Sequence, residues 1–211
     1  MAVLQGVCSA SVLDNRDPDG LGRVLVRVPG VTERETDVWA RVATMMAGRD
    51  RGTWFVPEVG DEVLVAFERG DLKVPYVIGA LWNAKSRPPA SGNADDAKLI
   101  RTRSGMTVRM QDNSNSLILE TPAGQRITLQ DGPDSVRIED SSGNSVKMEP
   151  DGVTVTTGAR LTINAATLEL SAAMVTVSAG MSRFSGVVQC DTLITNSVVS
   201  ASYTPGTGNI W

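Results

Sequence analysis

The chain has 211 residues, with 20 Lys or Arg against 24 Asp or Glu, a formal net charge of −4 and no histidine. Without a basic surface to neutralise phosphates, a nucleic-acid-binding protein is disfavoured. The absence of histidine removes the commonest general base, the Ser-His and Cys-His nucleophile pairs, and the commonest zinc ligand. We therefore expect no enzyme activity, no cofactor, and no catalytic, cofactor-binding or metal-binding residues.

The N-terminal residues MAVLQGVCSA lack the basic region and apolar core of a secretory signal, and no stretch approaches the roughly 18 apolar residues that span a bilayer. We expect synthesis in a cytoplasm. Cys8 and Cys190 lie at opposite ends of the sequence. We expect two separate buried thiols, with a disulfide between them as the open alternative.

Residues 1–90 have the pattern of a small antiparallel barrel. Apolar runs bounded by Gly and Pro predict strands within 20–30, 37–45, 61–68 and 73–83. The run DEVLVAFE at 61–68 is nearly continuously apolar, as in a strand buried on both faces. Short strands at hairpin spacing, without an amphipathic helix, predict an all-β fold that begins with a five-stranded OB-fold, the oligonucleotide/oligosaccharide-binding barrel.

Two groups of carboxylates in this half are candidate sites. Glu58, Asp61 and Glu62 flank the entry to a strand, so solvated turn residues are a better interpretation than an acid pair. The segment DNRDPDG at 14–20 resembles a calcium loop only faintly, because the spacing does not match and the terminal Glu is missing. A polar hairpin is the better interpretation there.

Residues 91–98 are predicted to be a linker, within a stretch of Pro, Gly, Ser and charged residues that has no periodicity. From 99 to about 200, pairs of apolar residues two positions apart recur, separated by turn residues, and each pair predicts one short strand with one apolar face. We predict that these residues form the core of a shaft: Val108, Met110, Leu117, Leu119, Ile127, Leu129, Val136, Ile138, Val146, Met148, Val153, Val155, Leu161, Ile163, Leu168, Leu170, Val175 and Val177.

A strand with only two inward residues cannot enclose a core alone, and a lone strand exposes its backbone edges. Two architectures satisfy these strands: a single-chain β-solenoid, and several copies wrapped into one intertwined β-prism. A solenoid needs about three strands per coil, so the repeat supplies only a few thin coils. We therefore favour a homotrimer in which each chain forms one face of a triangular shaft over 99–200.

Residues 52–89, GTWFVPEVGDEVLVAFERGDLKVPYVIGALWNAKSRPP, resemble the OB-fold module of the baseplate assembly protein V family, the central spikes of contractile-tailed phages. The same module occurs in the Vgr spikes of type VI secretion. The resemblance is carried by Phe55, Pro57, Val59, Gly60, Asp61, Glu62, Val63, Leu64, Val65, Gly70, Asp71, Pro75, Val77, Ile78, Gly79, Pro88 and Pro89. The run GLGRVLVRVPG at 20–30 matches the first-strand pattern of the family, and the trimeric needle that follows the barrel in these families matches the repeat more loosely.

The resemblance implies a structural role: a homotrimeric, membrane-piercing central spike, assembled in the bacterial host cytoplasm and found in the virion. The OB-folds would form a collar on a separate baseplate hub protein, and a triple-stranded β-helical needle would puncture the target cell envelope. The His-dependent iron tip of some small spikes does not carry over, since the chain has no His. The tip segment 201–211 instead ends in Ile210 and Trp211, which are candidate contacts for a separate PAAR-repeat tip protein.

The competing interpretation belongs to another class of function. It is an OB-fold binding module for nucleic acid or glycan, followed by a single-chain β-solenoid tail. That interpretation requires surface aromatics or basic clusters on the barrel strands. The densest basic stretch, Arg49-Asp50-Arg51, is interrupted by an acid, so we expect no nucleic-acid partner.

Overall fold

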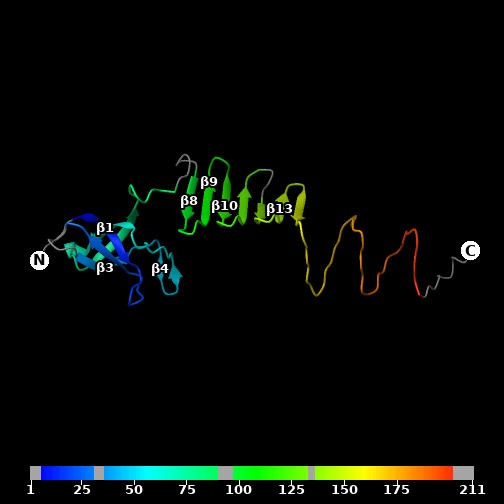
Figure 1. The fold of residues 1–211 in the computed structure, drawn as a ribbon, viewed down its shortest axis with the longest axis horizontal. Helices are drawn as coiled ribbons and strands as arrows, with labels where there is room; N and C mark the ends of the chain where they lie inside the picture. Colours follow the sequence, from blue (N-terminus) through cyan, green and yellow to red (C-terminus); the bar gives the residue numbers. More distant parts are fainter. Residues whose placement is uncertain (1–5, 31–35, 90–96, 133–135, 202–211) are drawn as a thin grey trace, which may run out of the picture. The chain divides into compact units, whose positions relative to one another are not determined.

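A computed structural model describes residues 6–30, 36–89, 97–132 and 136–201. The chain divides into two units, Met1–Arg160 and Leu161–Trp211. The first unit holds a barrel and a separate antiparallel sheet, and the second is an extended chain (Figure 1). Over the described residues the fold is all-β, as predicted, with one short 3-10 turn at Glu68–Gly70.

Five strands close the barrel in the order β1-β2-β3-β7-β6. Neighbours are antiparallel except β3 and β7, which run parallel, and this arrangement is that of an OB-fold. A small hairpin of β4 and β5 lies between β3 and β6 in the chain. The bounds are β1 Val7–Asp14, β2 Val24–Val28, β3 Thr36–Val42, β4 Ala47–Gly48, β5 Arg51–Gly52, β6 Glu62–Phe67 and β7 Pro75–Leu81.

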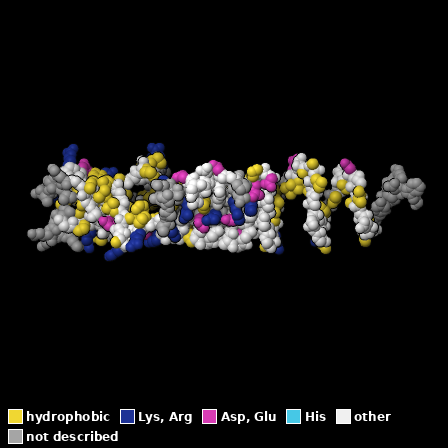
Figure 2. All heavy atoms as spheres, turned by 90° about the horizontal axis from the view of Figure 1, so that it is seen from above, with side chains coloured by type: hydrophobic (Ala, Val, Ile, Leu, Met, Phe, Trp, Pro, Cys, Tyr) yellow, Lys and Arg dark blue, Asp and Glu magenta, His cyan; other side chains and the backbone are white. Residues whose placement is uncertain are grey.

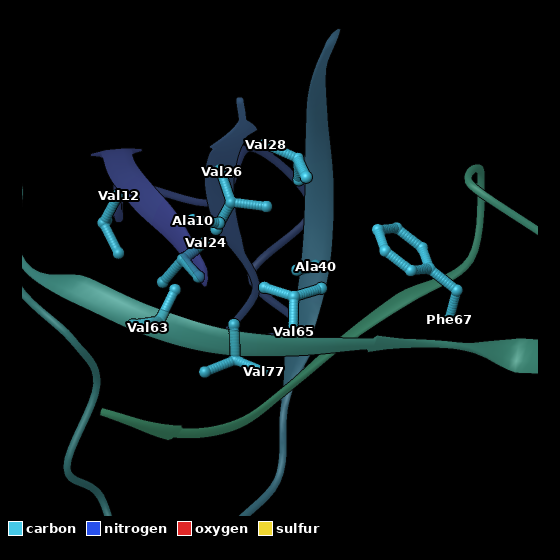
Figure 3. Close-up of a cluster of buried hydrophobic side chains, with 10 residues drawn as sticks. All are labelled: Ala10, Val12, Val24, Val26, Val28, Ala40, Val63, Val65, Phe67 and Val77. Atoms are coloured by element: carbon cyan, nitrogen blue, oxygen red, sulfur yellow. The ribbon is translucent and has the colours of Figure 1, made fainter. Parts of the chain in front are cut away.

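The barrel core is built from alternate residues of these strands. In β2, for example, Val24, Val26 and Val28 are buried, whereas Leu25 and Arg27 are only half-buried on the outer face. Valines dominate the core because a β-branched side chain fits the curved interior of a small barrel in few rotamers. The ten buried residues gather between the strands in Figure 3: Ala10, Val12, Val24, Val26, Val28, Ala40, Val63, Val65, Phe67 and Val77.

Two expectations for the barrel are wrong. The first strand is Val7–Asp14, so the run at 20–30 supplies the second strand. The alternation in β1 is weak in the sequence because its inward residues, Cys8, Ala10 and Val12, are mostly small. The strand at 61–68 is buried on one face only: Val63, Val65 and Phe67 point inward, whereas Leu64 and Ala66 are half-buried.

The β1–β2 connection is a polar hairpin, as predicted. The Asp17 carboxylate accepts hydrogen bonds from the backbone N–H groups of Asp19 (3.1 Å), Leu21 (2.9 Å) and Arg23 (3.1 Å). The Arg23 guanidinium donates to the same carboxylate at 2.7 Å. The carboxylate therefore ties together the loop that follows it.

The second part of this unit is a seven-stranded antiparallel meander in the order β14-β13-β12-β11-β10-β9-β8. The 91–98 linker lies mostly outside the described residues, and its last two residues already belong to β8. The strands are β8 Ala97–Arg101, β9 Thr107–Gln111, β10 Ser116–Glu120, β11 Arg126–Gln130, β12 Val136–Glu139, β13 Ser145–Glu149 and β14 Gly152–Thr156.

Turns of one kind join alternate strand pairs of the meander. Gly105, Gly124 and Gly143 each take a positive φ and donate a backbone hydrogen bond to the residue three positions earlier, which is Thr102, Thr121 or Asp140. The side-chain oxygens of Thr102, Thr121 and Asp140 also accept the backbone N–H four residues on. This turn recurs every 19 residues along the chain, so the repeating unit of the sheet is a hairpin of two strands.

Residues 161–201, the described part of the second unit, form neither helix nor strand. The chain there is extended and interrupted by bends, as the yellow-to-red segment of Figure 1 shows. The strands expected at Leu161/Ile163, Leu168/Leu170 and Val175/Val177 are not formed within the single chain, and their place in a trimeric shaft stays a prediction. An extended segment becomes a strand only beside another strand, and within the described residues its own chain provides none.

Candidate functional site

The clearest candidate site is an apolar face on the meander sheet. Leu119 lies opposite Val108 and Ile127, and Leu117 lies opposite Met110 and Leu129, so the side chains align across strands. One row is Ile100, Val108, Leu119, Ile127, Ile138, Val146 and Val155; the other is Met110, Leu117, Leu129, Val136, Met148 and Val153.

Every predicted shaft residue from Val108 to Val155 lies in one of these two rows. The structure also adds Ile100, which the sequence prediction missed because β8 was assigned partly to the linker and has no second apolar residue at the paired spacing. The pairing of Ile100 with Val108 places it at the end of the first row. Lys98 holds the equivalent place opposite Met110 in the second row.

The apolar face is uncovered in the single chain. Leu129 is 42% exposed and Val153 is 66% exposed. Leaving apolar surface in water costs about 25 cal/mol per Å², and soluble monomers seldom expose contiguous apolar patches larger than a few hundred Å². The first row crosses all seven strands and the second crosses six, so the rows form a continuous apolar surface of the kind that another molecule buries.

The opposite face of the sheet carries charged side chains, which form one ion pair between neighbouring strands and one within a single strand. Arg126 lies opposite both Glu120 and Glu139. Its guanidinium is 3.5 Å from the Glu120 carboxylate, and Arg137 is 2.6 Å from the Glu139 carboxylate. One face of the sheet thus suits water and the other suits a dry interface.

Exposed apolar side chains continue along residues 161–201. Ile163, Leu170 and Val177 are exposed there, as are Met181 and Phe184 further on. Figure 2 shows apolar side chains, in yellow, at intervals along the extended chain. Ile210 and Trp211, the proposed contacts for a tip protein, lie outside the described residues.

The two cysteines are separate free thiols, as expected, but they are not both buried. Cys8 is half-buried in the barrel, where burial raises the pKa of its thiol. Cys190 is exposed in the single chain, so the expectation of a buried thiol is wrong for Cys190 in one copy. The described residues of one copy bring nothing over it.

The carboxylates of the barrel are engaged in structural contacts. The hydrogen bond from Arg23 is the main cause that lowers the pKa of Asp17, and the Arg27 side chain does the same for Asp37. Asp61 accepts the backbone N–H of Glu58 at 2.8 Å, and Glu62 accepts a hydrogen bond from the Asn83 amide, also at 2.8 Å. These groups act as turn and strand-end residues.

Across the described ranges, no three His, Cys, Asp or Glu side chains are grouped closely enough to hold a metal ion. A search of the same residues finds no helix with the length and hydrophobicity to cross a membrane. The arrangement that remains is one of surfaces: a barrel with a closed core, a one-sided sheet, and an extended apolar segment.

Comparison with known proteins gives matches to both parts of the first unit. Residues 8–82 match the model of the type VI secretion system/phage-baseplate injector OB domain. Residues 115–181 match the model of the phage baseplate V C-terminal trimerisation domain. The second match covers most of the meander and continues into the extended segment.

The similar curated proteins include spike proteins of type VI secretion systems. VgrG2a of Pseudomonas aeruginosa is 38% identical over 88 residues, 40% of this chain and 10% of that protein. VgrG5 of the same species is 39% identical over 75 residues, 34% of this chain and 10% of that protein. VgrG3 of Vibrio cholerae is 35% identical over 75 residues, 34% of this chain and 7% of that protein. The chain thus spans about a tenth or less of the length of these relatives.

Proposed function

The chain belongs to the baseplate V family of phage and type VI injector spike proteins, and from that premise we propose that it is the homotrimeric central spike of a contractile injection machine. Its role is structural. The OB-fold barrels form a collar on a separate hub protein, and the residues from 97 onward form a needle that punctures the target envelope. No step of this function requires catalysis.

The observation that carries the proposal is the pair of apolar rows on the meander sheet. A sheet with one apolar face and one charged face buries the first by facing copies of itself. Three such sheets around a common axis enclose a dry core and leave the Glu120–Arg126–Glu139 face in water. The match of residues 115–181 to a trimerisation domain supports three copies over two.

The extended segment, residues 161–201, favours the proposal of a needle. Its apolar residues find cover when three copies wind around one another as a triple-stranded β-helix, because each copy then supplies the strands that its neighbours lack. Backbone hydrogen bonds between chains would make the shaft stiff, and stiffness is what a puncturing device needs. Exposed Ser and Thr in place of charged side chains would lower the cost of stripping water on membrane entry.

We place the protein in the tail baseplate of a virion, although the similar curated proteins are type VI spikes. A PAAR-repeat protein remains our proposed tip, on Ile210 and Trp211. The competing function, an OB-fold module for nucleic acid or glycan, has less support. On the outer face of β2 and β3, Arg27 is paired with Asp37. Just before β2, Arg23 stacks over Trp39 at 5.7 Å while it is bound to Asp17, so both cations already have partners within the barrel.

The deciding experiment is the native mass of the purified full chain, by light scattering on a sizing column, repeated after SDS at room temperature. We expect three times the chain mass of 22.4 kDa, with the trimer surviving SDS. A monomer of 22.4 kDa in native buffer would refute the trimeric spike and would favour the single-chain solenoid.

A further inference from the structure

One end of the barrel carries an apolar groove that the proposed function does not use. The groove has a volume of about 540 Å³ and lies between the β1–β2 loop, the β4–β5 hairpin and the segment before β6. Its apolar lining comes from Leu21, Met46, Trp54, Phe55 and Val56. Trp54 is 76% exposed and Phe55 is 65% exposed.

The groove is held by defined contacts. The Trp54 indole lies against the β1–β2 loop, where a Cβ added to Gly22 would come within 3.0 Å of the ring. The Thr53 N–H donates to the Met46 carbonyl at 3.0 Å, and the Thr44 hydroxyl donates to the Thr53 carbonyl at 2.8 Å. Two aromatic side chains are therefore presented to solvent on a fixed base, which is typical of a protein interface.

The topology of the barrel places this groove at the end where the chain leaves for the meander sheet. β7 ends at Leu81 opposite the first residue of β6, Glu62. β1 also ends there, since Val12 and Gly60 are hydrogen-bonded at the entry to β6. β3 runs parallel to β7, and its last residue, Val42, lies opposite Val77, so the chain that follows β3 runs in the same direction as the rest of β7, toward Leu81. The β1–β2 loop and the connection from β3 to β6 therefore both lie at the exit end.

Three copies joined through their shafts must bring these three exit ends together. Only 15 residues separate Leu81 from Ala97, and they reach at most about 50 Å when fully extended. A tether of that length holds the barrels at an effective concentration in the millimolar range. At that concentration, even a weak apolar contact between barrels is occupied.

We propose that the Trp54–Phe55 groove is an interchain contact, in which the exit end of each barrel packs against a second copy of this chain. A ring of three requires a head-to-tail contact between two different surfaces of each copy, so the groove of one barrel receives another part of its neighbour. This inference rests on the proposed homotrimer. It adds that the barrels, and not the shaft alone, carry intersubunit contacts.

The test uses the full chain with a photo-crosslinking residue, p-benzoylphenylalanine, introduced at one position at a time. Position 54 and position 55 are the test sites. Lys73 is the control, because it is exposed in the β6–β7 turn at the opposite end of the barrel. Each variant is irradiated in native buffer and then boiled in SDS, and its native mass is measured in parallel.

We expect a trimeric mass for all variants, with interchain adducts from positions 54 and 55 and none from position 73. A trimeric mass without interchain adducts from both test positions, or with equal adducts from position 73, overturns the groove contact and leaves the trimeric spike standing. A monomeric mass overturns the proposed function and this inference with it.

Discussion

Among single residues, Asp17 has the most concentrated set of contacts in the barrel. Its side chain is 3% exposed and receives three backbone N–H groups as well as the Arg23 guanidinium. We predict that Asp17→Asn lowers the melting temperature by several degrees, because the amide cannot accept all of these hydrogen bonds. Thermal unfolding followed by circular dichroism measures this, with the exposed Asp151→Asn as the matched control.

The same residue makes a prediction about pH. The folded state lowers the pKa of Asp17 below its ordinary value of 3.8, so its contribution to stability is present above pH 3.8 and is lost as the pH falls toward the lowered pKa. The difference in melting temperature between wild type and Asp17→Asn should therefore be full at pH 7 and shrink below about pH 4. A difference that stays constant down to pH 2 would contradict the role of the charge.

Leu129 and Thr128 are neighbours in β11 on opposite faces of the sheet, so they make a matched pair. In the single chain Leu129 is 42% exposed, so replacing it should cost much less than replacing a buried leucine unless other copies cover it. We predict that Leu129→Asn costs about 2–5 kcal/mol per chain, as for a buried leucine, and destroys the SDS-resistant trimer. Thr128→Asn should leave it intact. Equal effects of the two changes on native mass would argue against a buried apolar face.

At the scale of elements, the hairpins of the meander depend on their charged face for register. The apolar rows alone would tolerate a shift of one strand by two residues relative to its neighbour, because Leu, Ile and Val can replace one another in the rows. The Glu120–Arg126–Glu139 row does not tolerate it, since the Arg must stay between two carboxylates. This row therefore discriminates among registers that the apolar rows leave nearly equal.

We predict that Arg126→Glu, which places three carboxylates side by side, lowers stability by about 1 kcal/mol or less per like-charge pair. The loss should shrink in high salt, because these groups are partly exposed. The double variant Arg126→Glu with Glu120→Arg restores the opposite-charge pair between β10 and β11 and keeps Glu139 for Arg137, so it should recover part of the lost melting temperature. No recovery in the double variant would locate the effect of Arg126 in its packing.

At the scale of the whole molecule, the extended segment 161–201 reports on assembly. Alone, its amides have no strand partners among the described residues, so they should exchange with solvent within seconds. In an intertwined trimer they lie between chains and should be protected like those of β10 and β11. Hydrogen exchange with mass spectrometry on the native protein measures this directly. Fast exchange over 161–177 in a particle of trimeric mass would show a shaft that ends with the meander.

The sequence alone predicted a large part of this fold. The apolar runs of β2, β3, β6 and β7, bounded by Gly and Pro, indicate a barrel, because short strands at hairpin spacing without an amphipathic helix favour that fold. It could not reveal β1, whose inward residues Cys8, Ala10 and Val12 are too small and mixed for a clear period. It also could not show that Leu64 and Ala66 face outward, because an outer barrel face tolerates apolar residues.

The division of the shaft region was decided by tertiary structure. The two-apart apolar pairs look the same at Val153/Val155 and at Leu161/Ile163, and yet the first pair belongs to a strand and the second does not. Up to Thr156, each strand of the meander pairs with the strand next to it in the sequence. Short turns such as Thr121–Gly124 join these paired strands. Beyond Arg160 the described chain makes no such hairpin, so in the proposed trimer its strand partners come from other copies.

The sequence by itself determined which residues are apolar, where the period is two, and that no histidine chemistry is available, since these depend only on the order of side chains. The tertiary structure decided the alignment of the apolar pairs into two rows, the burial of Asp17 and the gathering of Trp54 with Leu21 at the exit end of the barrel. These depend on contacts between residues far apart in the chain. Such contacts are set by strand register and loop closure, which a local pattern does not encode.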